Sequence, residues 1–194
     1  MLKRICVFCG SSAGTREAYA QSAREVGRQL AERGIELVYG GGRVGLMGAV
    51  ADACLSAGGR VTGVIPQLLW DKEVGHRGLT ELRIVETMHE RKALMADLAD
   101  AFLALPGGYG TWDELCEVLT WSQIGIQQKA SAVLNVNGYY DPLLAMADRA
   151  VAEGFLSEVH RAMLLTDSDP VRMLDRLESY VAPAVDKWMD PVNR

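Results

Sequence analysis

Two glycine-rich stretches carry the residue types that bind phosphate groups. We call residues 40–45 (Gly-Gly-Gly-Arg-Val-Gly) the first glycine turn and residues 106–111 (Pro-Gly-Gly-Tyr-Gly-Thr) the second glycine turn. Each follows an apolar run and precedes a helical pattern. Glycine lets the backbone approach an anion closely, and N–H groups at a helix start donate hydrogen bonds to it. We therefore expect a small phosphorylated ligand here, bound more strongly by the second turn.

The first glycine turn has the Gly-x-Gly-x-x-Gly spacing of dinucleotide-binding proteins. Such a site also needs Asp or Glu about 20 residues later, at the end of the next strand, to hold a ribose. That strand ends here in Ile65-Pro66, which argues against a nicotinamide cofactor. Neither turn contains Gly-Lys-Ser or Gly-Lys-Thr, which argues against ATP hydrolysis. A second interpretation, in which the first turn's glycines only permit close packing, stays open.

Thr111 and Glu114 at the second glycine turn allow two interpretations. Thr111 is predicted to be the N-cap of the following helix, and Thr-x-x-Glu is the pattern of a capping box. In that case Glu114 only bonds back to the backbone. Alternatively, Glu114 lies within one helical turn of the bound phosphate, where a ribose would be.

Arg91 and Lys92 lie near the start of a helix predicted at residues 88–98. The helix dipole disfavours cations at this end, so a negatively charged ligand would explain them. The alternative is a solvated first turn in which Glu90 is the partner.

The elements that must position these residues alternate between short apolar runs and longer helical patterns. Strands are predicted at residues 4–8, 35–39, 60–65, 81–85, 101–105 and 131–136, with a seventh near 163–165. Helices are predicted at residues 17–33, 44–57, 88–98, 111–124, 142–153 and 170–180. Gly34, Gly58 and Gly154 are expected to end helices in the left-handed conformation.

This order predicts a single-domain, Rossmann-like α/β fold: a doubly wound parallel sheet with helices on both faces. Residues 1–181 would form a nucleotide-binding catalytic domain and residues 182–194 a C-terminal tail. Residues 66–78 are expected to form an irregular loop over the site.

Composition excludes several classes of partner. The 194 residues carry a net charge of −5, which disfavours binding to a nucleic acid polymer. No run is long enough to span a membrane, and the N-terminal residues lack a signal-peptide apolar segment, so we expect a cytoplasmic protein without a membrane partner.

Cys6 and Cys9 are interpreted as residues in or just after the first strand, with Cys6 a small buried side chain, rather than as a redox or zinc motif.

The motifs together resemble the LOG (Lonely Guy) family of cytokinin-activating phosphoribohydrolases, often mislabelled as lysine decarboxylases. The run from Pro106 to Glu114 is similar to the family's Pro-Gly-Gly-x-Gly-Thr-x-x-Glu signature, and the run from Met88 to Lys92 to its Met-His-x-Arg-Lys element. Further agreement lies in residues 9–12, 40–48, 120–125 and 135–140. The departures are Asp113, where many members have Glu, and a less typical loop at residues 71–80.

The resemblance implies hydrolysis of an N6-substituted adenosine 5′-monophosphate, or of AMP itself, to the free base and ribose 5-phosphate. It implies a homodimer and neither a metal nor an organic cofactor. Arg91 and Glu114 match the catalytic pair. The substrate-binding positions are Glu73, Lys92, Gly107, Gly108, Tyr109, Gly110, Thr111, Trp112, Asp113 and Thr120. Additional phosphate or nucleotide contacts are expected from Ser11, Gly41, Gly42 and Gly45.

Glycosidic cleavage builds positive charge on the ribose, which a carboxylate stabilises. Glu114 is therefore expected to hold the ribose hydroxyls or orient the attacking water, and Arg91 to stabilise the leaving base or fix the substrate. The alternative is a non-hydrolytic nucleotide sensor or molybdenum-cofactor carrier, because one fold supports both binding and catalysis. A lysine decarboxylase is disfavoured, because no lysine site for pyridoxal phosphate is recognisable.

Overall fold

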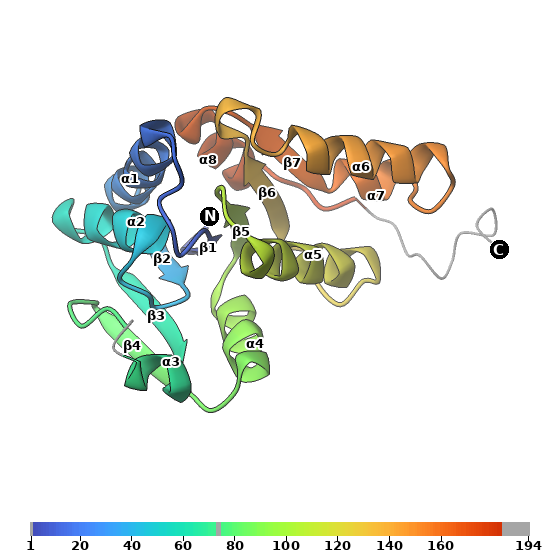
Figure 1. The fold of residues 1–194 in the computed structure, drawn as a ribbon. Helices are drawn as coiled ribbons and strands as arrows, with labels where there is room; N and C mark the ends of the chain where they lie inside the picture. Colours follow the sequence, from blue (N-terminus) through green and yellow to red (C-terminus); the bar gives the residue numbers. More distant parts are fainter. Residues whose placement is uncertain (1, 73–74, 184–194) are drawn as a thin grey trace.

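The computed structural model describes residues 2–72 and 75–183, which form a seven-stranded sheet flanked by helices (Figure 1). The strands are β1 (Arg4–Phe8), β2 (Glu36–Tyr39), β3 (Val61–Pro66), β4 (Glu81–Val85), β5 (Ala101–Ala104), β6 (Ala130–Leu134) and β7 (Leu164–Asp167). Their order is β4-β3-β2-β1-β5-β6-β7, and all neighbouring strands are parallel. The doubly wound parallel sheet expected from the sequence is confirmed.

Helices connect the strands in the βα order that the sequence predicts. They are α1 (Glu17–Glu32), α2 (Gly45–Ser56), α3 (Gln67–Asp71), α4 (Met88–Leu98), α5 (Tyr109–Gln123), α6 (Asp141–Ala152), α7 (Glu158–Ala162) and α8 (Pro170–Glu178), with a 3₁₀ turn η1 (Val136–Gly138). Gly34, Gly58 and Gly154 follow α1, α2 and α6 with φ of 68°, 81° and 79°, which confirms the predicted helix ends.

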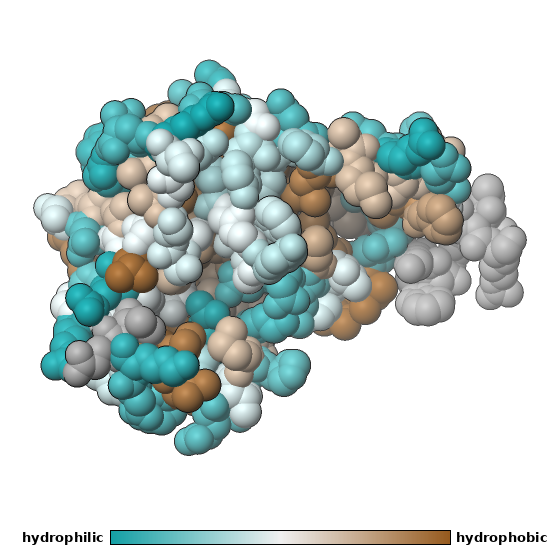
Figure 2. Space-filling view, in the orientation of Figure 1, coloured by the Kyte–Doolittle hydropathy of each residue, from teal (hydrophilic) through white to brown (hydrophobic). Residues whose placement is uncertain are grey.

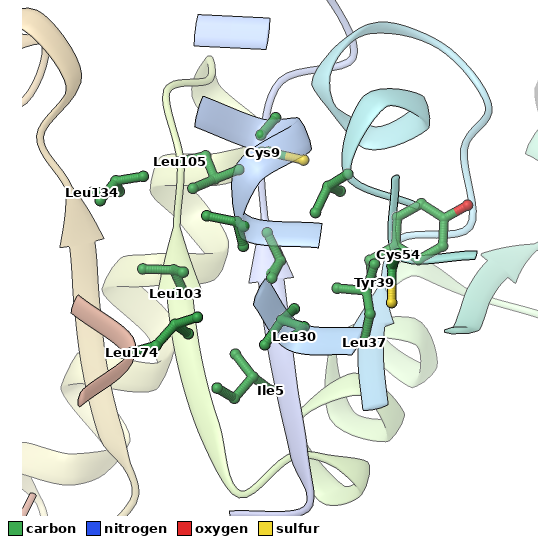
Figure 3. Close-up of a cluster of buried hydrophobic side chains, with 14 of the residues drawn as sticks. Ile5, Cys9, Leu30, Leu37, Tyr39, Cys54, Leu103, Leu105, Leu134 and Leu174 are labelled. Carbon is green, nitrogen blue, oxygen red and sulfur yellow. The ribbon is translucent and has the colours of Figure 1, made fainter. Parts of the chain in front are cut away.

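The core consists of two layers, because successive strand residues face opposite sides of the sheet. Ile5 and Val7 of β1 pack with α1, α2 and α8 on one face, while Cys6 and Phe8 pack with α4 and α5 on the other. Figure 3 shows part of the first layer, where Leu30 of α1 and Leu174 of α8 lie against Ile5, Leu37 and Leu103. Burial on both faces explains why the central strands are almost wholly apolar.

Three local predictions differ from the structure. The strand expected to reach residue 136 ends at Leu134, because Asn137 takes a left-handed conformation (φ 53°) inside η1. The loop expected at residues 66–78 contains the short helix α3, and α7 was not predicted. Short helices such as these have too few residues to show a periodic pattern. The expected tail from residue 182 lies outside the described residues except for Ala182 and Pro183.

Gly27 allows α1 and α2 to pack closely, and its replacement by alanine is expected to destabilise the fold. A Cβ at this position would overlap the carbonyl oxygen of Val50 and lie 2.9 Å from the backbone nitrogen of Cys54. Such overpacking usually costs about 1–3 kcal/mol, although Gly→Ala in a free helix gains about 1 kcal/mol. Urea unfolding of Gly27→Ala should therefore show a lower free energy of unfolding. Gln21→Ala, on the exposed side of α1, is the control and should change it by less than about 0.5 kcal/mol.

Among the described residues, no helix combines the length and the apolar character that crossing a membrane requires.

Candidate active site

The candidate site lies where the strand order reverses, at the carboxyl ends of β1 and β5. Parallel α/β sheets bind ligands at this switch point. Gly10, just after β1, donates its N–H to the carbonyl of Pro106 at 3.0 Å and accepts a hydrogen bond from the N–H of Leu46 at 3.0 Å. The loop after β1 therefore joins the second glycine turn to the start of α2, next to the first. The sequence motifs did not identify this bridging role of Gly10.

The second glycine turn leads into the first residues of α5, which border open space. Gly108, not Thr111, is the N-cap of α5, so the helix begins two residues earlier than predicted. The prediction of Thr111 as N-cap is wrong, because Tyr109 and Gly110 before it are already helical, and Thr111 is buried against Gly107. The first N–H groups of any helix lack an intrahelical acceptor. A Cβ at Gly108 or Gly110 would meet no atom from elsewhere in the chain within 4 Å, so the Cα atoms at the start of α5 border open space.

The first glycine turn is covered by protein. A Cβ at Gly45 would overlap the carbonyl carbon of Ser11, and the N–H of Leu46 is taken by Gly10. Gly41 accepts a hydrogen bond from the N–H of His76 at 2.9 Å, and Gly42 forms a β-bridge with Gly75. These contacts account for the glycines by close packing. Contacts from Ser11, Gly41, Gly42 and Gly45 to a nucleotide stay predictions.

Arg91 and Glu114 form an ion pair between α4 and α5. The Arg91 Nη1 lies 3.2 Å from Glu114 Oε1, and each side chain is 11% exposed. The same guanidinium donates from Nε to the carbonyl of Val64 (3.1 Å) and from Nη2 to the carbonyl of Gly40 (3.3 Å). Arg91 thus reaches from α4 to β3, to the residue that follows β2 and to α5, and is held at three points.

This pair excludes one of the two interpretations that the sequence left open for each residue. Glu114 lies in the second turn of α5 and faces Arg91, so the capping box with Thr111 does not form. Glu90 accepts a hydrogen bond from the N–H of Glu86 at 2.9 Å instead of pairing with Arg91. The charge of Arg91 is met by a carboxylate and two carbonyl oxygens of the protein.

Lys92 joins the same two helices on a more exposed side. Its Nζ lies 3.0 Å from Asp113 Oδ2 and 3.2 Å from Glu117 Oε1. Glu117 was not among the residues singled out from the sequence. The two cations of α4 therefore pair with three carboxylates of α5, which fixes the rotation of α5 about its axis.

Burial governs the electrostatics of this pair. It raises the pKa of Glu114, and the attraction of Arg91 opposes the rise only in part. Burial also raises the pKa of Cys6 and Cys9, and the nearby charge of Glu114 adds to the rise. Both thiols therefore stay protonated, and Cys6 is a fully buried side chain of β1, as predicted.

Other predicted site residues differ in where they lie. Tyr109 and Trp112 are exposed beside the second glycine turn, with ring centroids 5.3 Å apart. Thr120 is exposed and bonds to the carbonyl of Cys116, roughly 16 Å along α5 from Tyr109 at about 1.5 Å per residue. The structure does not bring Thr120 to the helix start within one chain. Glu73 lies outside the described residues.

The described residues hold no cluster of three or more His, Cys, Asp or Glu side chains suited to a metal ion.

Comparisons with known proteins give close relatives. A family model described as "possible lysine decarboxylase" matches residues 47–177. The chain is 51% identical over 179 residues to the cytokinin riboside 5′-monophosphate phosphoribohydrolase LOG of Oryza sativa subsp. japonica, covering 92% of this chain and 74% of the relative. It is 49% identical over 179 residues to LOG1 of Arabidopsis thaliana, named for the same activity, covering 92% and 84%.

Solved structures share the fold at lower identity. A molybdenum cofactor binding protein from Rippkaea orientalis matches with a TM-score of 0.70 and 19% identity, over 92% of this chain and 97% of that one. The molybdenum cofactor carrier protein of Chlamydomonas reinhardtii matches with a TM-score of 0.70 and 20% identity, over 93% and 100%. At this identity the likeness concerns the fold alone.

Proposed function

The chain belongs to the LOG family of cytokinin riboside 5′-monophosphate phosphoribohydrolases, and on this premise we propose that it hydrolyses the N-glycosidic bond of N6-substituted adenosine 5′-monophosphates. The products are the free adenine-type base, a cytokinin, and ribose 5-phosphate. The description of the family model names a different reaction. The relatives that are about 50% identical over most of the chain are named for the phosphoribohydrolase reaction. The observation that carries the proposal is the buried Arg91–Glu114 pair beside the open start of α5.

The second glycine turn binds the 5′-phosphate in this proposal. The N–H groups of Gly108, Gly110 and Thr111 lie at the positive end of the α5 dipole, where an anion is stabilised. Gly108 and Gly110 leave the space that phosphate oxygens need. Binding energy from the phosphate then holds the ribose in place for reaction.

Glu114 is the catalytic carboxylate. It lies about 6 Å along the α5 axis from Gly110 and on the same side of the helix, since residues four apart share a face. As the bond between C1′ and the base nitrogen breaks, positive charge grows on the ribose and a nearby carboxylate stabilises it. As the bond to the base nitrogen breaks, the water oxygen bonds to C1′. Glu114 orients the water or accepts one of its protons and then passes that proton to solvent, while the leaving base takes up one proton from solvent.

Arg91 acts through Glu114. Its contacts are the carboxylate and the carbonyls of Gly40 and Val64, so it holds the carboxylate in one orientation and favours its charged form. We assign it as a positioning residue for Glu114. Lys92 pairs with Asp113 in the same way and holds its carboxylate. Direct contacts with the substrate stay proposals for the other predicted positions, which are Lys92, Asp113, Tyr109, Trp112, Thr120 and Glu73.

The test is release of the free base from N6-isopentenyl-AMP, AMP and adenosine under identical conditions, followed by chromatography, with ribose 5-phosphate as the second product of the two nucleotides. We expect release from the nucleotides and at least about tenfold slower cleavage of adenosine, because the lost phosphate contacts no longer position the ribose. Equal turnover of AMP and adenosine would remove the second glycine turn from the mechanism. Binding without release would instead favour a non-hydrolytic nucleotide sensor or carrier.

We also infer that the chain works as a homodimer in the cytoplasm and acts on a nucleotide rather than a nucleic acid polymer. Large apolar side chains are exposed at Leu68 (64%), Tyr109 (86%) and Ile126 (67%), as interfaces require. Figure 2 shows hydrophobic surface near α3 and near the C-terminal end of α5. All four cysteines are free thiols, which suits a reducing compartment. Sedimentation at assay concentrations should give twice the mass of one chain; a monomer with full activity would contradict the dimer.

A further inference from the structure

The run of residues 135–140 (Asn-Val-Asn-Gly-Tyr-Tyr) has no role in the chemistry proposed so far. In the structure its two tyrosines reach the second glycine turn. The Tyr139 hydroxyl donates to the carbonyl of Gly107, and the Tyr140 hydroxyl donates to the carbonyl of Leu105 at 2.6 Å. Two consecutive side chains from the loop after β6 thus hold the backbone after β5.

Local structure explains how both rings point the same way. Asn137 and Gly138 take left-handed conformations (φ 53° and 72°) that turn the chain back toward β5. Asn135 fixes the turn, because its Oδ1 accepts from the N–H of Tyr140 and its Nδ2 donates to Asp141, both at 2.7 Å. Tyr140 is buried, and Tyr139 is half-buried with its ring edge-on to Tyr140 at 5.1 Å.

The two hydroxyl groups hold peptide units that differ in one respect. In a trans peptide, the carbonyl and the following N–H point in opposite directions, so fixing one fixes the other. The bond to Gly107 therefore fixes the direction of the Gly108 N–H at the start of α5. The bond to Leu105 fixes a peptide whose nitrogen belongs to Pro106 and carries no hydrogen.

The carbonyl between them is also held, because Pro106 accepts the N–H of Gly10 at 3.0 Å. Gly108 itself accepts the N–H of Trp112 at 3.1 Å as α5 begins. Every carbonyl from Leu105 to Gly108 thus accepts a hydrogen bond from within the protein, which fixes the peptide units that lead into α5.

We propose that Tyr139 is a positioning residue for the 5′-phosphate, which it aligns by holding the Gly107–Gly108 peptide, whereas Tyr140 only stabilises the fold. This inference rests on the proposed function, because it assumes that the second glycine turn binds the phosphate. It predicts that two adjacent and chemically identical hydroxyl groups differ in their effect on ligand affinity.

The experiment compares Tyr139→Phe with Tyr140→Phe, each of which removes one hydroxyl from the same turn. Ribose 5-phosphate and inorganic phosphate are titrated by calorimetry, and KM and kcat are measured with AMP. Tyr139→Phe is expected to weaken ribose 5-phosphate binding and raise KM by about three- to tenfold, with a smaller change in kcat. Tyr140→Phe should leave both within about twofold but lower the urea midpoint more, because a buried carbonyl loses its partner.

Equal losses of affinity in the two variants, or no loss in Tyr139→Phe, would overturn the inference and leave both tyrosines with a structural role. Failure of the proposed function gives a different result. In that case the wild-type chain itself either binds neither ribose 5-phosphate nor phosphate, or binds them without releasing ribose 5-phosphate from AMP.

Discussion

Glu114→Gln is expected to lower kcat/KM for N6-isopentenyl-AMP and AMP by at least about 10³-fold while the chain stays folded. Glutamine has nearly the same shape and can still accept a hydrogen bond from Arg91, which lies 3.2 Å away. It carries no charge, so it stabilises neither the growing charge on the ribose nor a proton taken from water. Single-turnover release of ribose 5-phosphate measures the loss, and circular dichroism reports the fold.

Glu117→Gln is the matched control for this substitution. Glu117 is also a carboxylate of α5 and pairs with Lys92 at 3.2 Å, but no step of the proposed mechanism involves it. We expect its kcat/KM to stay within a few-fold of the wild type. Near-normal activity of Glu114→Gln, or equal losses in the two variants, would show that the carboxylate only supports the packing of α4 against α5.

The pH profile distinguishes two roles for the same side chain. Burial raises the pKa of Glu114 above the ordinary 4.5, so the ionised form is lost at a higher pH than for an exposed glutamate. If the carboxylate is the active form, kcat/KM falls as the pH drops through this raised pKa. If Glu114 instead protonates the leaving base, activity falls as the pH rises through it. We expect the first behaviour.

The fold could be predicted from the sequence because its signals are local and repeated. Apolar runs such as Ala101–Ala104 indicate strands, and glycines such as Gly34 indicate where helices end. The βα order then leaves few topologies, since parallel crossovers are right-handed. Positions such as Gln67–Asp71 were missed because a single helical turn has no period to detect.

The glycine turns and their charged neighbours could be predicted, but their partners could not. Thr111 and Glu114 satisfy a local pattern, whereas the true partner of Glu114 is Arg91 on another helix. Two of Arg91's three acceptors are the backbone carbonyls of Gly40 and Val64. Every residue has a backbone carbonyl, so the amino-acid type does not show which carbonyl accepts the bond. The tyrosine hydroxyls of residues 139 and 140 act on carbonyls in the same way.

Gly40 provides the space in which Arg91 is held, and this leads to the second prediction. A Cβ at Gly40 would overlap Arg91 Nη2 and lie 3.0 Å from its Cζ. A side chain's far end usually moves aside at little cost, but this guanidinium is buried and bonded to Val64, Gly40 and Glu114. Gly40→Ala therefore displaces Arg91 and with it the carboxylate. We expect kcat/KM to fall about 10- to 100-fold and the free energy of unfolding by about 1–3 kcal/mol.

A double-variant cycle shows whether Gly40 acts through Arg91. In an Arg91→Ala chain the three atoms nearest to a Cβ at residue 40 are absent, so adding Gly40→Ala should change the urea-unfolding free energy by less than about 0.5 kcal/mol. Strong non-additivity of this kind is the expected result. If Gly40→Ala destabilises the Arg91→Ala chain as much as it does the wild type, the glycine serves another contact and Arg91 is not held by the space it leaves.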